Sequence, residues 1–125
     1  MSPDLYESDN ISNKSPKLRY AYFLQKIAQS KELWTLVDSE GAFALFEVEN
    51  TIVISLWSDE AYIESNLTPD WAEYIPFKLS MDALQEILIP FIRQNNYLIN
   101  VFPVDSRVGH IVSLNDFIKD INREL

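Results

Sequence analysis

A serine and two acids stand together at residues 58–60, directly after Trp57. A hydroxyl beside carboxylates suggests nucleophilic catalysis, which needs a base to take the hydroxyl proton and a carboxylate to orient that base. The base would be His110, the only histidine in the chain. Its surroundings, RVGHIVS, contain no glycine–serine–glycine pattern, and an ordinary strand or turn histidine is the simpler interpretation. We therefore expect no catalytic residues and a protein that is not an enzyme.

The spacing of the acids and glycines also argues against metal and phosphate chemistry. Glu60 and Glu64 are four residues apart and would share one helical face, but a calcium loop needs alternating oxygen ligands around a glycine. Gly41 and Gly109 are the only glycines, and neither begins a phosphate-binding motif. Because the chain has no cysteine, disulfides, thiolate metal sites and cysteine nucleophiles are excluded. We expect neither a metal nor a cofactor.

Charge is distributed unevenly along the chain. The total is −9, from 19 acids and 10 lysines and arginines. Between Lys31 and Lys78 there is no basic residue, whereas ten acids fall in that interval. Such a field repels phosphate backbones, so we expect no nucleic-acid partner, and it favours a basic protein partner or dissolved cations. The simpler explanation is that these acids keep the protein soluble.

Aromatic residues supply the remaining candidates. Trp34 and Trp57 alternate with aliphatic residues in predicted strands, as core tryptophans do. Trp71 instead lies in a predicted loop, between Asp70 and Tyr74, without strand or helix periodicity. A loop tryptophan often closes the end of a core, but an aromatic residue among acids is also a natural anchor for a protein partner. The candidate partner-binding residues are therefore Glu60, Glu64, Asp70, Trp71 and Tyr74.

Length and composition indicate one globular domain. The chain has 125 residues, of which 47% are hydrophobic and 13% aromatic. Residues 1–14 are polar and are expected to form a flexible N-terminal arm, which leaves 15–125 as a single domain. No run of about 18 apolar residues and no signal peptide is present, so we expect a cytoplasmic protein without a membrane partner.

Serines mark the predicted helix starts. Ser15 and Pro16 are typical of a helix N-cap and first turn, and apolar residues follow at helical spacing. A strand, a serine and an amphipathic helix then recur in ISLW-S-DEAY, FKL-S-MDAL and HIV-S-LNDF. Each serine is predicted to be an N-cap, with an acid soon after it that the positive end of the helix dipole favours. These serines are Ser58, Ser80 and Ser113.

The fold class follows from the order of these elements. Strands are predicted at 33–38, 42–47, 51–57, 75–79, 97–102 and 110–112. The first three read as an antiparallel meander in which the third is a central strand, and Pro76 places 75–79 at an edge or a strand start. Pro90 should kink the helix that begins at Ser80 or begin a separate turn. We expect an α+β fold: a mainly antiparallel sheet of about five strands, with helices packed largely on one face.

Four segments carry a resemblance to a known family: RYAYFLQKIAQSKELWTL (19–36), ISLWSDEAYIES (54–65), DWAEYIP (70–76) and YLINVFPVDSRVGHIVS (97–113). They resemble a bacterial family known as "domain of unknown function 2750", over roughly residues 16–124. That family is uncharacterised, so the resemblance implies no activity and no site residues. A fainter similarity, to SseB-type N-terminal domains, implies an α+β binding module rather than an enzyme. This chain lacks the glycine-rich turns of those domains.

The expected function is therefore a small acidic cytoplasmic protein that binds another protein without catalysis, through region 32–73 and the loop around Trp71. One specific form is an immunity-type inhibitor, whose acids mimic a phosphate backbone in a basic toxin cleft. The alternative is a small-ligand-binding protein or enzyme with a pocket lined by carboxylates such as Glu60, Glu64 or Asp70. Self-association into a homodimer through an edge strand is a third option.

Overall fold

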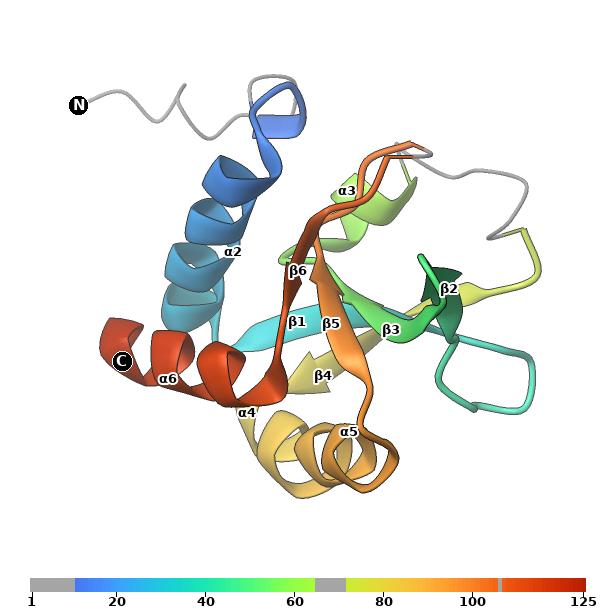
Figure 1. Ribbon diagram of the computed structural model, residues 1–125. Coiled ribbons are helices and arrows are strands. Elements are labelled where there is room, and N and C mark those ends of the chain that lie inside the picture. Colours follow the sequence, from blue (N-terminus) through green and yellow to red (C-terminus); the bar gives the residue numbers. More distant parts are fainter. Residues whose placement is uncertain (1–10, 65–71, 106) are drawn as a thin grey trace.

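The computed structural model describes residues 11–64, 72–105 and 107–125, and its α+β architecture confirms the predicted fold class (Figure 1). Six strands form a two-stranded sheet in the order β1-β4 and a four-stranded sheet in the order β2-β3-β5-β6. The strands are β1 (Glu32–Val37), β2 (Phe46–Val48), β3 (Thr51–Leu56), β4 (Ile75–Ser80), β5 (Leu98–Val101) and β6 (His110–Val112). The helices are α2 (Pro16–Ser30), α3 (Glu60–Glu64), α4 (Met81–Ala83), the π-helical turn η3 (Leu84–Leu88), α5 (Ile89–Asn95) and α6 (Leu114–Glu124).

Helix α2 begins where its sequence predicts. The hydroxyl of Ser15 accepts a hydrogen bond from the backbone N–H of Leu18 at 3.3 Å, and Pro16 occupies the first turn, where no N–H is needed. The helix ends at Lys31, whose backbone is left-handed with φ 63°. Its inner face buries Phe23 and Ile27 in the core.

The predicted antiparallel meander is wrong in its first pairing. β1 pairs with β4, which lies well over thirty residues further along the chain, with Glu32 opposite Ser80 and Val37 opposite Ile75. The segment predicted as a strand at 42–47 makes only an isolated bridge, from Phe43 to Val37, before β2 begins. The hairpin of β2 and β3 is confirmed, and β3 is central as predicted. Strand propensity marks these segments as extended, but it does not select their partners.

Pro76 faces the open edge of β4. Trp34 exchanges both backbone hydrogen bonds with Trp57, and the carbonyl of Leu36 accepts from the N–H of Ala44. The backbone N–H and C=O groups of Trp34 and Leu36 therefore point away from β4. Those of the β1 residues that alternate with them point toward β4. In an antiparallel pair, the backbone groups of two opposed residues either bond to each other or both point away from the partner strand. Pro76 is opposite Leu36, so its backbone nitrogen, which carries no hydrogen, points to the outer side of β4. The predicted edge position is confirmed.

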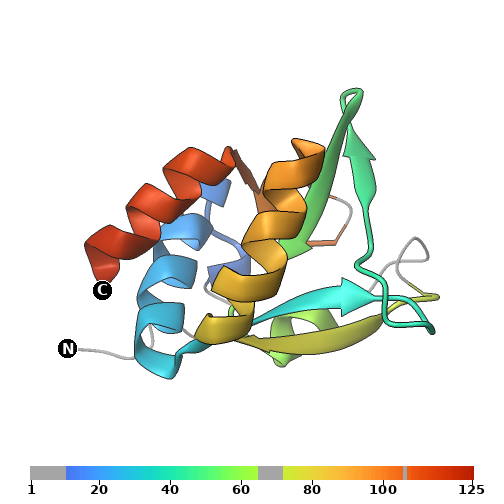
Figure 2. The same cartoon turned by 90° about the horizontal axis from the view of Figure 1, so that it is seen from below.

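The four-stranded sheet contains one parallel pair, β3 with β5, and two antiparallel pairs. Helices α2 and α6 pack on each other; both contact β5, and α2 also contacts β6, while α5 packs against α6 (Figure 2). Helices α3 and α4 pack against β4 instead. The largest side chains in the core between these layers are fully buried; they include Trp57, Phe102 and Phe117.

The helix that follows Ser80 changes its winding just before Pro90, where the sequence predicted an interruption. Its first turn is α-helical, its middle is the π-helical turn η3, and α5 carries Pro90 in its first turn. The N–H of Ile89 bonds to the carbonyl of Leu84, five residues earlier. A π-turn accommodates proline because the ring and the missing N–H prevent the regular bond four residues back.

Two of the three predicted serine caps are confirmed. The hydroxyls of Ser80 and Ser113 accept first-turn N–H bonds at 3.0 Å and 3.2 Å. Ser58 is not a cap, because α3 begins two residues later and the buried Ser58 hydroxyl donates to Asp59 at 2.9 Å. The preceding residue, Trp57, still forms a bridge with Trp34 of β1. Ser58 therefore lies at the end of the sheet, and the helix begins only after it.

The predicted N-terminal arm lies mostly outside the described residues. Of its last four residues, Ile11 is 3% exposed and belongs to the core cluster, and the carbonyl of Lys14 accepts a bond from Arg19. Within residues 11–64, 72–105 and 107–125, none of the helices combines the length and the apolar character that crossing a membrane requires.

Candidate functional site

An open hollow of about 380 Å³ lies where β1 ends and β4 begins. Because Val37 is opposite Ile75, the residues that follow β1 lie beside those that precede β4. This pairing brings three carboxylates and a tyrosine together from segments more than thirty residues apart. We call this surface the acidic hollow; it is lined by Asp38, Ser39, Glu40, Glu73 and Tyr74.

The turn that supplies one wall is built by Asp38. Its Oδ1 accepts from the N–H of Glu40 at 2.9 Å and from the N–H of Ala42 at 3.0 Å, and the Asp38 carbonyl accepts from Gly41. Gly41 has φ +87°, a backbone conformation that other residues adopt only with strain. The Asp38 carboxylate is thus held by the backbone, while Glu40 is exposed at the tip of the turn.

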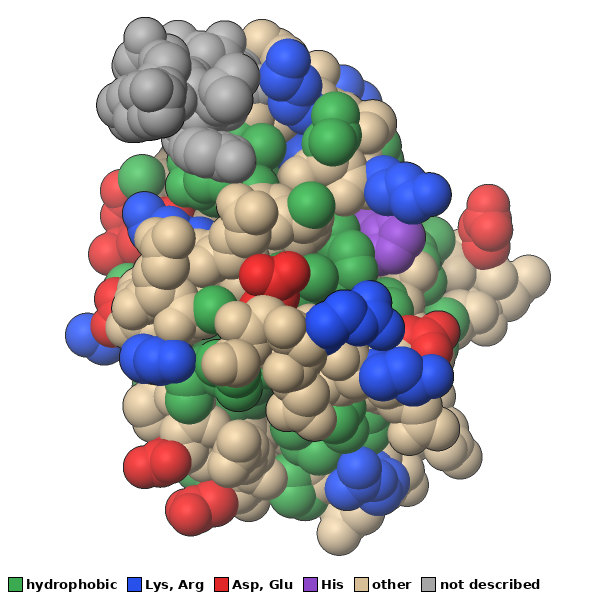
Figure 3. Space-filling model, turned by 90° about the vertical axis from the view of Figure 1, so that its left-hand side faces the viewer, with side chains coloured by type: hydrophobic (Ala, Val, Ile, Leu, Met, Phe, Trp, Pro, Cys, Tyr) green, Lys and Arg blue, Asp and Glu red, His purple; other side chains and the backbone are tan. Residues whose placement is uncertain are grey.

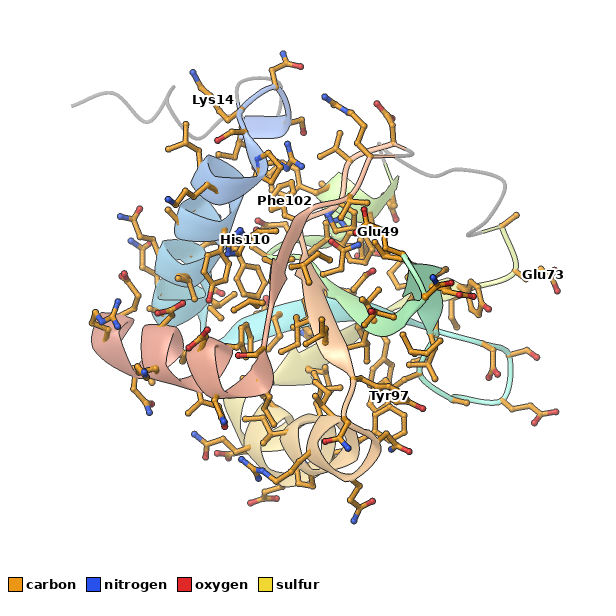
Figure 4. The ribbon with its side chains drawn as sticks, viewed as in Figure 1. Lys14, Glu49, Glu73, Tyr97, Phe102 and His110 are labelled. Atoms are coloured by element: carbon orange, nitrogen blue, oxygen red, sulfur yellow. The ribbon has the colours of Figure 1, made fainter. Side chains whose placement is uncertain are left out.

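Tyr74 and Glu73 supply the other wall. The Tyr74 ring is half-buried and makes an edge-on contact with Phe46, at 5.6 Å between ring centroids. Glu73 is exposed and extends outward at the end of the molecule farthest from α2 (Figure 4). The hollow therefore combines a fixed aromatic surface with carboxylates that are free to meet solvent or a partner.

No lysine or arginine is among the described residues that line the hollow. Three ion pairs occur among the described residues: Lys26–Asp59 at 3.7 Å, Lys78–Glu32 at 3.6 Å and Arg123–Asp120 at 3.4 Å. None of them involves an acid of the hollow. A basic group that enters it would meet carboxylates that no described lysine or arginine neutralises.

Of the five predicted site residues, the structure places three. Tyr74 lines the hollow, whereas Glu60 and Glu64 lie on α3, which packs against β4. Partial burial, the hydrogen bond with Glu64 and the charge of Glu64 raise the pKa of Glu60, so this pair is a second acidic cluster. Asp70 and Trp71 lie outside the described residues.

The predicted site omitted Asp38, Glu40 and Glu73, although the run of acids included all three. Their turn signal, Asp38 three residues before Gly41, was visible in the sequence. The pairing of β1 with β4 that brings them to Glu73 was not. No group of three or more histidine and acidic side chains among the described residues is arranged to hold a metal ion.

His110 lies in β6, which confirms that it is a strand residue. Its ring stacks on Tyr20 with 4.5 Å between centroids, and the Tyr20 hydroxyl donates to Asp120 at 2.6 Å. Burial lowers the pKa of His110, and the charge of Lys17 adds to this effect while Asp120 opposes it. Burial together with the Asp120 carboxylate raises the pKa of Tyr20, which keeps the phenol protonated.

Arg19 holds the loop between β5 and β6. Its side chain is 2% exposed and donates to three carbonyls: Phe102 at 2.9 Å, Lys14 at 2.6 Å and Val108 at 3.4 Å. Phe102 is buried with φ 61°, a strained conformation for an aromatic residue. The sequence signalled neither feature, since an arginine on a helical face is usually solvated.

Comparison with known proteins identifies the family of the chain. The family described as "Protein of unknown function (DUF2750)" matches residues 20–121, which include every strand and both walls of the acidic hollow. No curated protein matches the chain. The fainter similarity to SseB-type domains stays an expectation. Since the matched residues span most of the sequence, the chain belongs to the DUF2750 family of proteins of unknown function.

Proposed function

We propose that this protein is a non-enzymatic binding module whose acidic hollow docks a basic segment of a protein partner. The observation that supports it most is the composition of the hollow. Three carboxylates and one aromatic ring line an open concave surface of about 380 Å³, and no lysine or arginine is among its lining residues. A cationic side chain fits this surface both by charge and by contact with the ring face.

The strength of such docking depends on several weak contacts acting together. Exposed ion pairs contribute about 0.2–1 kcal/mol each, so a single pair gives little affinity. Asp38 needs little reorganisation, because its carboxylate is already bonded to two backbone N–H groups. The wider acidic stretch, with no base between Lys31 and Lys78, accelerates encounter with a basic partner.

An immunity-type inhibitor is one specific form of this proposal. In that form the carboxylates of the hollow and of Glu60 and Glu64 would replace nucleic-acid phosphates in the basic cleft of a toxin. Carboxylates serve this purpose because arginine and lysine bind them and phosphates with similar geometry. The form differs from general docking in the kind of partner: a nuclease or another nucleic-acid-binding protein.

Charge reversal in the hollow tests the proposal. Tagged wild-type protein, Glu40→Lys/Glu73→Lys and a control, Glu86→Lys/Glu124→Lys, are compared in pulldowns from the native host. All four positions are exposed, and the two variants change the net charge equally. We expect wild type and control to capture the same protein and the hollow variant to lose it.

The captured protein is then purified and its affinity measured by calorimetry. We expect the hollow variant to bind roughly tenfold more weakly or worse, because two ion pairs become repulsions. Equal recovery and equal affinity for all three proteins would exclude docking at the hollow. A further variant, Glu60→Lys/Glu64→Lys, shows whether the acids of α3 contribute to the same surface.

A further inference from the structure

Basic side chains gather on the side of the molecule away from the acidic hollow. Hydrogen bonds and ring stacking bring the segments that carry these side chains together: Arg19 donates to the carbonyls of Lys14 and of Val108, and the ring of His110 stacks on Tyr20. Figure 3 shows the side of the molecule on which α2 lies, with lysine and arginine side chains near the histidine and a few acids among them. We call this surface the basic corner; it consists of Lys14, Lys17, Arg19, Arg107 and His110.

The basic corner has little internal compensation. The guanidinium of Arg19 is buried and donates to carbonyls only, and burial and then the charge of Arg107 lower its pKa. Among the described residues, none of Lys14, Lys17 and Arg107 takes part in an ion pair. A cationic group buried without an acid beside it is costly, and an approaching carboxylate lowers that cost.

Acids do occur at the margins of the corner. Asp120 interacts with His110, but it also accepts the Tyr20 hydroxyl and pairs with Arg123. Asp105 stands at the turn of the hairpin that carries Arg107, and it forms no ion pair with a described residue. The corner therefore remains basic, although the chain as a whole carries −9.

We propose that the basic corner of one copy docks the acidic hollow of a second copy, so that molecules associate head to tail. This inference rests on the proposed function and names the partner of the hollow. In Figure 4, Lys14 and His110 lie on one side of the molecule and Glu73 on the other, so the two surfaces of one copy cannot meet. They are complementary only between copies, which makes the contact heterologous rather than two-fold symmetric.

Exposed apolar side chains border both surfaces. Leu18 and Val108, beside the corner, are 55% and 42% exposed, and Ile75, beside the hollow, is 57% exposed. Burying them between two copies adds a favourable contribution that does not depend on salt. Charge then sets the register of the contact, and the apolar margins stabilise it.

Nucleic acid is the less favoured occupant of the basic corner. A duplex extends beyond a patch of this size and would meet the rest of a surface whose net charge is −9. The acidic hollow of a second copy has the matching charge and, like the corner, an apolar border. Its carboxylates reach the corner without bringing a long anion against the other acids.

Sedimentation velocity at increasing protein concentration tests the proposal. We expect concentration-dependent association of the wild-type protein in about 0.1 M NaCl, weakened in about 0.5 M NaCl, where exposed charges are screened over a few ångströms. The corner variant Lys17→Glu/Arg107→Glu and the hollow variant Glu40→Lys/Glu73→Lys should each associate roughly tenfold more weakly. Arg93→Glu/Lys119→Glu matches the charge change of the corner variant outside it and should behave as wild type.

The decisive variant carries all four substitutions. In this variant two glutamates stand in the corner and two lysines in the hollow, and its net charge equals that of the wild type, so we expect association to recover relative to the double variants. A wild-type protein that stays monomeric throughout, or a fourfold variant no better than the double variants, overturns the proposal. The same follows if the corner binds a duplex oligonucleotide while the protein remains monomeric. If a different host protein is still captured through Glu40 and Glu73, the proposed function stands without this inference.

Discussion

Gly109 is the position where one added methyl group should disturb the fold most directly. Its backbone crosses the end of β5 just before β6 begins. A Cβ there would lie 2.1 Å from the carbonyl oxygen of Val101 and 2.8 Å from backbone atoms of Phe102 and Pro103, well inside the 3.0 Å that real Cβ atoms respect. All three contacts are backbone, so no side-chain rotation relieves them. Gly109→Ala must therefore displace one of two chain segments.

The cost follows from the hydrogen bonds at this crossing. The N–H of Gly109 donates to Asn100 Oδ1 at 2.8 Å, and Arg19 Nε donates to the Phe102 carbonyl at 2.9 Å. A buried neutral hydrogen bond contributes about 1 kcal/mol and one from a charged group about 1.5–3 kcal/mol. We predict that Gly109→Ala lowers the free energy of unfolding by about 3 kcal/mol, a large part of the total for a domain of this size.

Urea unfolding followed by tryptophan fluorescence measures this loss. Trp57 is a suitable reporter because it is fully buried and its Nε1–H donates to the Pro103 carbonyl at 3.0 Å. The control is Gly41→Ala, where no atom lies within 4 Å of the new Cβ and only the φ of +87° is unfavourable, at roughly 1–2 kcal/mol. If the free energy of unfolding of Gly109→Ala is within about 1 kcal/mol of the wild-type value, the reasoning from backbone crowding is refuted.

Three further changes have defined outcomes. Arg19→Met should lower the free energy of unfolding by about 3 kcal/mol in the same urea assay, because buried carbonyls such as that of Phe102 lose their donor; a change below about 1 kcal/mol contradicts this. Ser113→Ala should cost about 1 kcal/mol and reduce helicity by circular dichroism, since the Asp116 N–H loses its cap; unchanged helicity and stability count against it. For His110, the folded pKa is lowered by burial, so the unfolded chain binds more protons and stability falls as the pH drops from about 6.5 through the folded pKa. When the pH is lowered from about 7.5 to about 5, the free energy of unfolding should fall less for His110→Gln than for the wild type. The difference should be under about 1 kcal/mol because the ring is partly exposed, and an identical fall would contradict the role given to His110.

Local signals in the sequence predicted the elements well. Ser15 and Pro16 marked the start of α2, and Ser113 marked the start of α6, because capping depends on a hydroxyl within reach of the next turn. Pro90 gave the place where the helix changes its winding. Each of these signals acts over a few residues, and such interactions are the ones that a sequence pattern contains directly.

Pairing between distant segments was not predictable in the same way. The backbone hydrogen bonds between Trp34 and Trp57 lie on one side of β1. The other side of β1 pairs with β4, which is distant in the sequence. The parallel pairing of β3 with β5 was likewise absent from the prediction. The sequence around Ser58 predicts a helix cap, but the bridge between Trp57 and Trp34 keeps Ser58 at the end of the sheet. Long-range packing decided each of these cases.

The same limit applies to the candidate site. Tyr74 was predicted from its aromatic character among acids, and the structure places it in the hollow. Asp38 and Glu40 were visible only as members of an acidic stretch, since the pairing of β1 with β4 is what brings them to Glu73. The acidic character of this region could therefore be predicted from composition, whereas the concave surface that the acids line could not.

The contacts of Arg19 set a condition on the order of folding. Two of its carbonyl partners lie 83 and 89 residues further along the chain. At roughly 5–20 residues per second, a ribosome needs several seconds after making α2 before those partners exist, and until then the guanidinium stays in water. The nascent N-terminal half thus cannot complete its own core. The arginine becomes buried only in a chain whose last hairpin is already present, so that its burial follows synthesis of nearly the whole protein.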